Sequence, residues 1–195
     1  ASVNEAAADA ATAAAKRVFG PADVVRIGTD IPIPLRHALD DASTLGQDRA
    51  LNAVAAYDRA GQAVVVVDVG TATTVDFVDG EGVFQGGAIA PGAAMMLDAL
   101  HAGTSALPAV GFVPPDPARG VFGRDTVHAM RLGAVAAVRG VFRELLDRYA
   151  EAYGGYPQVI GAGGDIGLLE ETGLVDHVAA DLQVLGMAVA LRTSL

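Results

Sequence analysis

The sequence predicts an α/β fold in which a three-stranded meander is followed by alternating helices and a strand. Residues 63–69 form an almost unbroken run of valines, which is typical of a strand buried on both faces. Residues 73–78 and 83–85 follow as two further short strands, after turns at Gly70-Thr71 and Asp79-Gly80. Because helices alternate with a strand only after this meander, the order favours a ribonuclease H-like domain over a uniformly alternating Rossmann sheet.

The helices and the remaining strands are predicted from apolar spacing and from the residues that stop each element. Asn4 is a suitable N-cap for an alanine-rich helix that runs to about Phe19 and ends at Gly20-Pro21. The two X-Pro steps in residues 31–34 predict an extended linker. Further helices are predicted over residues 48–60, 93–101, 126–153 and 182–195, and further strands over residues 24–27 and 156–161.

Composition and charge narrow the class of protein. The chain has 195 residues, enough for one domain or for one domain plus part of another. Its 52% hydrophobic and 18% charged residues exclude a disordered chain, and the absence of cysteine excludes disulfides and thiolate metal sites. A net charge of −10 argues against nucleic acid as a partner, and the single lysine, Lys16, excludes a Walker-type phosphate loop.

No segment of the sequence is typical of a membrane span or a secretory signal. The longest apolar runs, such as residues 63–67, have the length of a strand and are too short to cross a bilayer. Glu5 and Asp9 interrupt the first apolar stretch, and no basic segment precedes it. We therefore expect no membrane partner.

The first candidate site follows the buried strand at residues 68–74. Asp68 ends the strand, Gly70 leaves room for a phosphate, and the hydroxyls of Thr71, Thr73 and Thr74 are suited to phosphate oxygens or a hydrated cation. The alternative is that these residues form only a polar hairpin turn.

The second candidate site is the segment Gly46-Gln47-Asp48-Arg49. Asp48 falls in the first turn of a predicted helix, where it could act as a general base for a substrate hydroxyl while Arg49 binds a carboxylate. On spacing alone, a helix-capping carboxylate is the better explanation of Asp48.

Two glycine-rich segments complete the candidates. Residues 86–92 lead into a helix N-terminus and could line an anion or a nucleotide. Residues 161–167 imitate a dinucleotide fingerprint, but the third glycine is displaced by one and no acidic strand end follows at the usual offset. The four histidines are scattered without metal-ligand spacing.

Taken in order, these segments closely resemble the type III pantothenate kinases. The resemblance covers essentially the whole chain and is carried by six motifs: Gly46 to Arg49 with Asn52 to Ala56, Asp68 to Thr74, Gly86 to Gly92, Leu107-Pro108, Gly123 to Thr126, and Gly163-Gly164. It implies an actin-like ATPase fold, in which two ribonuclease H-like domains close on ATP in a cytoplasmic homodimer.

The resemblance also implies a role for each site residue. Asp48 would be the catalytic base that takes the proton from the primary hydroxyl of pantothenate in the first step of coenzyme A synthesis. The substrate-binding residues would be Gly46, Gln47, Asp48, Arg49 and Thr126. Asp68 would hold a monovalent cation, K⁺ or NH₄⁺, beside Mg²⁺ and ATP, and the ATP-binding residues would be Thr71, Gly163 and Gly164.

One motif of the family has no counterpart in this sequence. Family members begin with a strand and an Asp-x-Gly-Asn-Thr phosphate loop, whereas Ala1-Ser2-Val3 matches a later strand. We therefore expect residues 1–40 to be the C-terminal remnant of a truncated first domain and residues 41–195 to be a complete second domain. Because misplaced reactants lose orders of magnitude in rate, the isolated chain should be inactive or very weak.

Two other functions remain open on the sequence. One is a non-catalytic binding or regulatory module with the same fold, and the other is an acyl or sugar kinase of the same superfamily. Retention of Asp48, Asp68, Thr71 and Thr126 favours the enzyme.

Overall fold

The computed structural model describes residues 5–20 and 24–195. Within these residues a six-stranded sheet has the order β1-β4-β3-β2-β5-β6. Its strands are β1 (Arg36–His37), β2 (Val64–Val69), β3 (Ala72–Val78), β4 (Val83–Pro91), β5 (Gln158–Ala162) and β6 (His177–Val178). The helices are α1 (Glu5–Phe19), α2 (Gln47–Ala60), α3 (Ala93–Ala102), α4 (Thr126–Tyr153), α5 (Gly167–Glu170) and α6 (Leu182–Ser194), with 3-10 turns at Ala42–Thr44 and Pro117–Arg119.

The strand directions confirm the ribonuclease H-like class. Strands β2, β3 and β4 are consecutive antiparallel neighbours, while β5 pairs parallel to β2 and β6 pairs parallel to β5. Parallel neighbours need crossover connections, and helices lie in the connections that lead to β5 and β6. A meander followed by helix-linked parallel strands is the topology that the sequence predicts.

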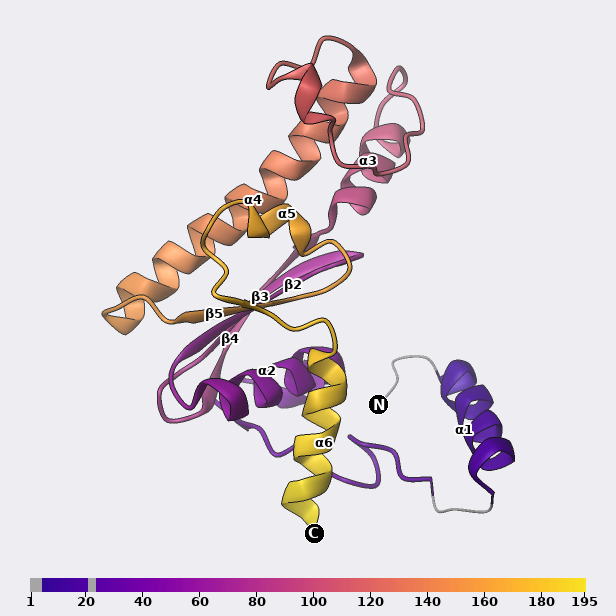
Figure 1. Ribbon diagram of the computed structural model, residues 1–195, viewed down its shortest axis with the longest axis vertical. Coiled ribbons are helices and arrows are strands. Elements are labelled where there is room, and N and C mark those ends of the chain that lie inside the picture. Colours follow the sequence, from indigo (N-terminus) through magenta and orange to yellow (C-terminus); the bar gives the residue numbers. More distant parts are fainter. Residues whose placement is uncertain (1–4, 21–23) are drawn as a thin grey trace.

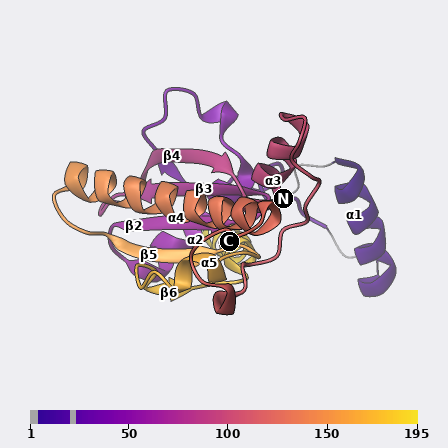
Figure 2. The same cartoon turned by 90° about the horizontal axis from the view of Figure 1, so that it is seen from above.

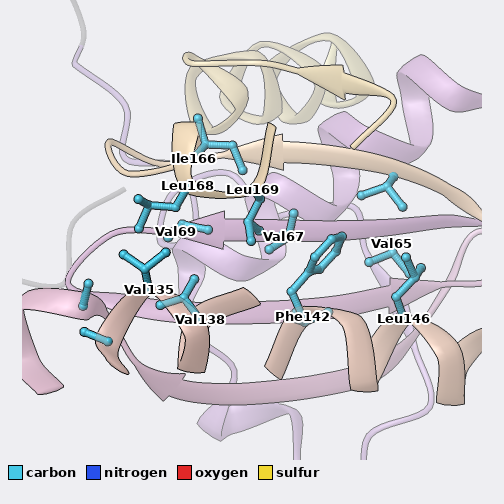
Figure 3. Close-up of a cluster of buried hydrophobic side chains, with 14 of the residues drawn as sticks. Val65, Val67, Val69, Val135, Val138, Phe142, Leu146, Ile166, Leu168 and Leu169 are labelled. Atoms are coloured by element: carbon cyan, nitrogen blue, oxygen red, sulfur yellow. The ribbon is translucent and has the colours of Figure 1, made fainter. Parts of the chain in front are cut away.

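The alternation of side chains along β2 divides the core between the two faces of the sheet. Val65, Val67 and Val69 are fully buried on the α4 face, while Val64 and Val66 are buried on the α2 face. Figure 3 shows the first of these clusters. The side chains labelled there are Val65, Val67, Val69, Val135, Val138, Phe142, Leu146, Ile166, Leu168 and Leu169. Because Asp68 lies two residues after Val66 and four after Val64 on the same strand, its side chain belongs to the α2 face.

The helices are arranged in layers on the two faces. Helices α3, α4 and α5 lie on one side of the sheet and α2 and α6 on the other, and the first turns of α4 extend with α3 well beyond the strands (Figure 1). Helix α1 stands to one side of the sheet in both views (Figures 1 and 2), and its Asp9 pairs with Arg26 at 2.6 Å. No helix among residues 5–20 and 24–195 is long and apolar enough to cross a membrane.

Most predicted elements occur within a residue or two of their expected bounds, with informative exceptions. Strand β4 runs to Pro91 rather than stopping at residue 85, because Gly86 to Ala90 pair with β3. Residues 24–27 do not form a strand, since only an isolated bridge joins Ile27 to Ile31. The short strands β1 and β6 were not expected. The predicted cap Asn4 lies outside the described residues.

The described residues before residue 40 contact the rest of the chain in several places, of which two involve the sheet and the helices α2 and α6. Arg36 and His37 pair with β4, and Ile27 packs with Leu51 of α2 and Ala190 of α6. A division into residues 1–40 and 41–195 stays a prediction.

Candidate functional site

The sheet brings most of the predicted site residues to one edge. Strands β2, β4 and β5 run in the same direction, so that Asp68, Pro91 and Ala162 stand at the same edge of the sheet. Helix α2 precedes β2 and returns along it, and its N-terminal turn therefore lies at this edge as well. The negative charge of Asp48 contributes to the raised pKa of Asp68, in keeping with their position at the same edge.

Asp68 is partly buried and held from two sides. Asn52 of α2 donates a hydrogen bond from Nδ2 to Asp68 Oδ2 at 2.9 Å. Gly163, at φ +93°, lies against the other oxygen, and a Cβ atom there would stand 2.4 Å from Asp68 Oδ1. Burial is the main cause that raises the pKa of Asp68, the bond from Asn52 opposes it, and the negative charge of Asp48 adds to it.

Asp48 is exposed, in contrast to Asp68. It lies in the first turn of α2, and its carboxylate bends back over Gly46, where a Cβ atom would stand 2.4 Å from Asp48 Oδ1. Only a residue without a side chain leaves the carboxylate in this position. Asp48 can therefore accept a proton from a molecule in solvent-accessible space.

Arg49 points into the protein rather than outward. Its Nε donates to both carboxylate oxygens of Asp76 at 3.1 Å, and its Nη2 forms an ion pair with Asp76 Oδ1. Burial raises the pKa of Asp76, which is 1% exposed, while Arg49 opposes the rise. Gly87 covers the pair, since a Cβ atom there would stand 2.1 Å from Asp76 Oδ1. Removing either partner would leave a buried charge.

Gln47 contacts the segment before the linker. A Cβ atom on Gly28 would lie 2.7 Å from Gln47 Nε2, and Gly28 has φ +90°. Gln47 Oε1 is buried without a hydrogen-bond partner in the described part of the chain. Within the predicted motif Gly46 to Arg49, Asp48 is exposed and the other three residues are partly buried.

Thr71 is exposed in the turn between β2 and β3, and the start of α3 packs against this turn. The backbone N–H of Gly92 donates to Thr71 O at 3.0 Å, and a Cβ atom on Gly92 would stand 1.9 Å from Gly70 O. Gly92 is the N-cap of α3, so the N-terminal end of that helix faces the site edge. Such an end favours an anion.

Gly164 is exposed with open space around its Cα, and it lines a cavity of about 520 Å³. The cavity lies between the proline-rich loop after α3 and the turn that leads from β5 to α5. Its walls are mostly apolar, from residues such as Phe112, Pro114 and Val135, with Asp165 among the polar groups. A flat apolar group attached to a charged tail would suit this space.

Thr126 lies at the opposite end of α4 from the residue that bonds to the sheet. Thr126 is the first residue of α4, while Tyr149 near the other end donates to Val75 O of β3 at 3.2 Å. At 1.5 Å per residue, Thr126 lies roughly 34 Å along the helix from Tyr149. It belongs to the part of α4 that extends beyond the sheet (Figure 1).

The donor atoms at this edge suit a hard cation. Asp68 offers a carboxylate, and Asn52 Oδ1 is buried without a partner in the part of the chain that the structure describes. No group of three or more His, Cys, Asp or Glu side chains that could hold a metal occurs within residues 5–20 and 24–195. A cation here would therefore need oxygens from the substrates or from solvent as well.

Sequence reasoning missed two polar residues of this site. Asp76 interrupts an apolar strand and shares the face of Asp68, which is a signal that alternation along the strand could have given. Asn52 sits inside a run of buried residues on α2, and a polar residue at such a position also indicates a special contact.

A ribonuclease H-like sheet with carboxylates, threonines and glycines at one edge places the protein in the class with an actin-like ATPase fold, and these residue types suit phosphate groups and cations. A family model described as "Type III pantothenate kinase" matches residues 1–148. The chain belongs to the type III pantothenate kinase family.

Individual relatives support this assignment. The chain is 37% identical over 179 residues to a type III pantothenate kinase of Ruegeria pomeroyi, and the matched region covers 91% of this chain and 68% of the relative. It is 41% identical over 176 residues to the type III pantothenate kinase of Rhodopirellula baltica, and this matched region covers 87% of this chain and 61% of the relative. The chain thus spans about two thirds of the length of these relatives.

A solved structure shows the same fold. A protein from Campylobacter jejuni, described as a Baf family transcriptional activator, has a TM-score of 0.56 and 21% identity, over 83% of this chain and 69% of that one. The similarity concerns the fold alone.

Proposed function

We propose that the protein catalyses the ATP-dependent phosphorylation of pantothenate to 4′-phosphopantothenate, the first step of coenzyme A synthesis. The observation that carries the proposal is the convergence of an exposed carboxylate, Asp48, with a recessed one, Asp68, at the sheet edge where Gly163 and Thr71 also lie. Family membership gives the substrate.

The chemical step needs a base and correct positioning. The primary hydroxyl oxygen of pantothenate attacks the γ-phosphorus of ATP, a new P–O bond forms, and the P–O bond to ADP breaks. The hydroxyl proton passes to the Asp48 carboxylate. Asp48 suits this role because its carboxylate is exposed at the beginning of α2.

ATP would bind along the turns at the sheet edge. Thr71 would contact the phosphates near the N-terminal end of α3, and Gly163 and Gly164 would pass beneath the adenosine, with the cavity beside Gly164 receiving the base. Mg²⁺ and a monovalent cation held by Asp68 would neutralise charge on the phosphates.

Pantothenate would bind over the start of α2. Gly46 allows close approach, and Gln47 anchors the segment to the turn at Gly28. Arg49 uses Nε and Nη2 for Asp76, which leaves Nη1 for a substrate oxygen.

The protein is proposed to act as a cytoplasmic homodimer. Large apolar side chains are exposed at the extended end of α3 and α4 and in the loop between them, namely Met95, Leu100, Val113, Val121 and Phe122. Phe122, for example, is 73% exposed. We propose that these side chains belong to one apolar surface, which would be typical of an interface. Since Thr126 belongs to the same end, it would reach pantothenate bound to the partner subunit.

The direct test is ADP release that depends on pantothenate, measured with the full-length protein and its Asp48→Asn variant. We expect the variant to lose at least about a hundredfold in kcat, as is typical for removal of a general base. Its melting temperature should stay unchanged because Asp48 is exposed. Equal activity in the variant would disprove the role of Asp48. If calorimetry shows that ATP and pantothenate bind without turnover, a non-catalytic module is the better description.

A further inference from the structure

Helix α2 contains a buried asparagine, Asn52, at a position where packing does not call for one. Asn52 is 2% exposed and lies between the buried apolar residues Leu51 and Ala53. Asparagine is a poor residue for a helix interior, because its side chain competes for backbone hydrogen bonds. Burial of its amide is unfavourable unless both ends find partners. Packing of the hydrophobic core therefore does not explain why an asparagine occupies position 52.

Asn52 forms a hydrogen bond to Asp68, which connects helix α2 to the end of β2. Asn52 lies one helical turn after Asp48, on the same side of α2. Its Nδ2 donates to Asp68 Oδ2 at 2.9 Å, across the gap between helix and strand. A single helix turn thus presents the proposed base and at the same time holds the second carboxylate of the site.

This bond makes the two oxygens of Asp68 unequal. Oδ2 is held by Asn52, whereas Oδ1 is directed at the turn of Gly163, where a Cβ atom would stand 2.4 Å from it. Rotation of the carboxylate would break the first contact and crowd the second. The orientation of Asp68 is therefore fixed from α2 and from the turn after β5.

The other end of the amide has no partner. Asn52 Oδ1 is buried without a hydrogen bond among the residues that the structure describes. The amide cannot be reversed to relieve this, because an ionised carboxylate only accepts hydrogen bonds. An unsatisfied buried acceptor lowers stability, so the stability of the fold does not explain Asn52.

We propose that Asn52 is a positioning residue, which fixes the Asp68 carboxylate so that Oδ1 faces the Gly163 turn and can take part in binding the monovalent cation. The inference rests on the proposed function, since it assigns the cation to Asp68. Outer residues that orient a cation ligand typically contribute about 10-fold to 100-fold in affinity or activity.

The experiment uses the full-length protein with Asn52→Leu, a substitution of similar volume that removes the donor. The melting temperature is measured in KCl and in tetramethylammonium chloride at equal ionic strength. In the second salt the variant should melt close to the temperature of the unchanged protein, because the lost bond to Asp68 and the removal of a buried unsatisfied oxygen act in opposite directions. The rise that potassium gives the unchanged protein should be lost.

Kinetics give a second measurement. The potassium concentration for half-maximal activity should rise at least about tenfold in the variant, as for other residues that orient ligands. The KM for pantothenate should stay nearly constant. Val54→Ala is the matched control, since Val54 is also buried on α2 but makes no bond to Asp68. It should melt at a lower temperature and keep the potassium dependence.

Two results would overturn the role of Asn52: a full potassium response in Asn52→Leu, or no potassium response in the unchanged protein. An unchanged protein that is stabilised by potassium but does not phosphorylate pantothenate would instead contradict the proposed function. The thermal measurement would then still decide the role of Asn52.

Discussion

Gly163 lies so close to Asp68 that a Cβ atom at position 163 would stand 2.4 Å from the carboxylate oxygen Oδ1. The same atom would stand 2.3 Å from the backbone oxygen of Val69. The turn after β5 is therefore in contact with the end of β2, and no side chain fits between them.

Gly163→Ala should destabilise the protein and impair the site together. The substitution combines a backbone at φ +93° with a clash against main-chain atoms, and we expect a loss of about 2–4 kcal/mol in the free energy of unfolding. Urea denaturation measures this loss. Gly164→Ala is the control, because its Cβ would meet nothing within 4 Å. Equal losses in the two variants would contradict the contact with Asp68.

Arg49→Ala should be among the most destabilising substitutions in the chain. It leaves Asp76 buried without its partner, which typically costs about 3–5 kcal/mol. Adding Asp76→Asn to Arg49→Ala should recover much of the loss, and a double-mutant cycle by denaturation measures the recovery. Additive losses would mean that the two residues do not act as a pair.

The effect of Arg49→Ala should depend on pH. Burial raises the pKa of Asp76 above its ordinary value of 3.8, so the folded state binds a proton more readily than the unfolded state, and stability falls as pH rises between the two pKa values. Loss of Arg49 raises the folded pKa further and widens this window. Arg49→Ala should therefore cost less stability at pH 4 than at pH 7. A loss independent of pH would contradict this account.

Gly28→Ala should disturb the segment that carries Asp48. Its Cβ would lie 2.7 Å from Gln47 Nε2, at a backbone φ of +90°. We expect a higher KM for pantothenate in addition to a loss of stability of about 1–2 kcal/mol. Gly61→Ala is the control, since Gly61 has φ +61° and open space, and thus isolates the backbone strain. The prediction is wrong if both variants leave KM unchanged.

Phe122→Asp should separate the proposed dimer. A charge in the exposed apolar end of α3 and α4 opposes burial there, and light scattering should report the mass of a monomer. Activity should fall as well, because Thr126 would no longer reach the partner's site. Val184→Asp, at an exposed position on α6, is the control and should leave the mass unchanged.

The elements that could be predicted from the sequence are those whose pattern is long or repeated. The valine run of β2 and the capped helix α4 give strong local signals. Strands β1 and β6 have two residues each and exist because a neighbouring strand offers a partner, which local sequence does not reveal. Strand β4 continues through Gly86-Gly87, which resembled a loop, because pairing with β3 overrides the low strand propensity of glycine.

The candidate site was predictable where chemistry follows a strand end or a helix start, as for Asp68 and Asp48. The direction of a side chain was not. The sequence offered Arg49 only as a possible ligand for a substrate carboxylate, and spacing could not reveal that its Nε and Nη2 bind Asp76, 27 residues away in the sequence. The bond between Asn52 and Asp68 likewise depends on how α2 packs on the sheet.

The pairing of Arg49 with Asp76 has a consequence for how anions approach the site. The guanidinium that follows Asp48 in the sequence is already neutralised by Asp76, so Asp48 and Asp68 leave the sheet edge electronegative. A triphosphate meets repulsion there unless counterions accompany it. Nucleotide affinity should therefore increase with the concentration of cations that bind at the site. At an anion site formed by basic residues, added salt would instead screen the attraction and lower the affinity.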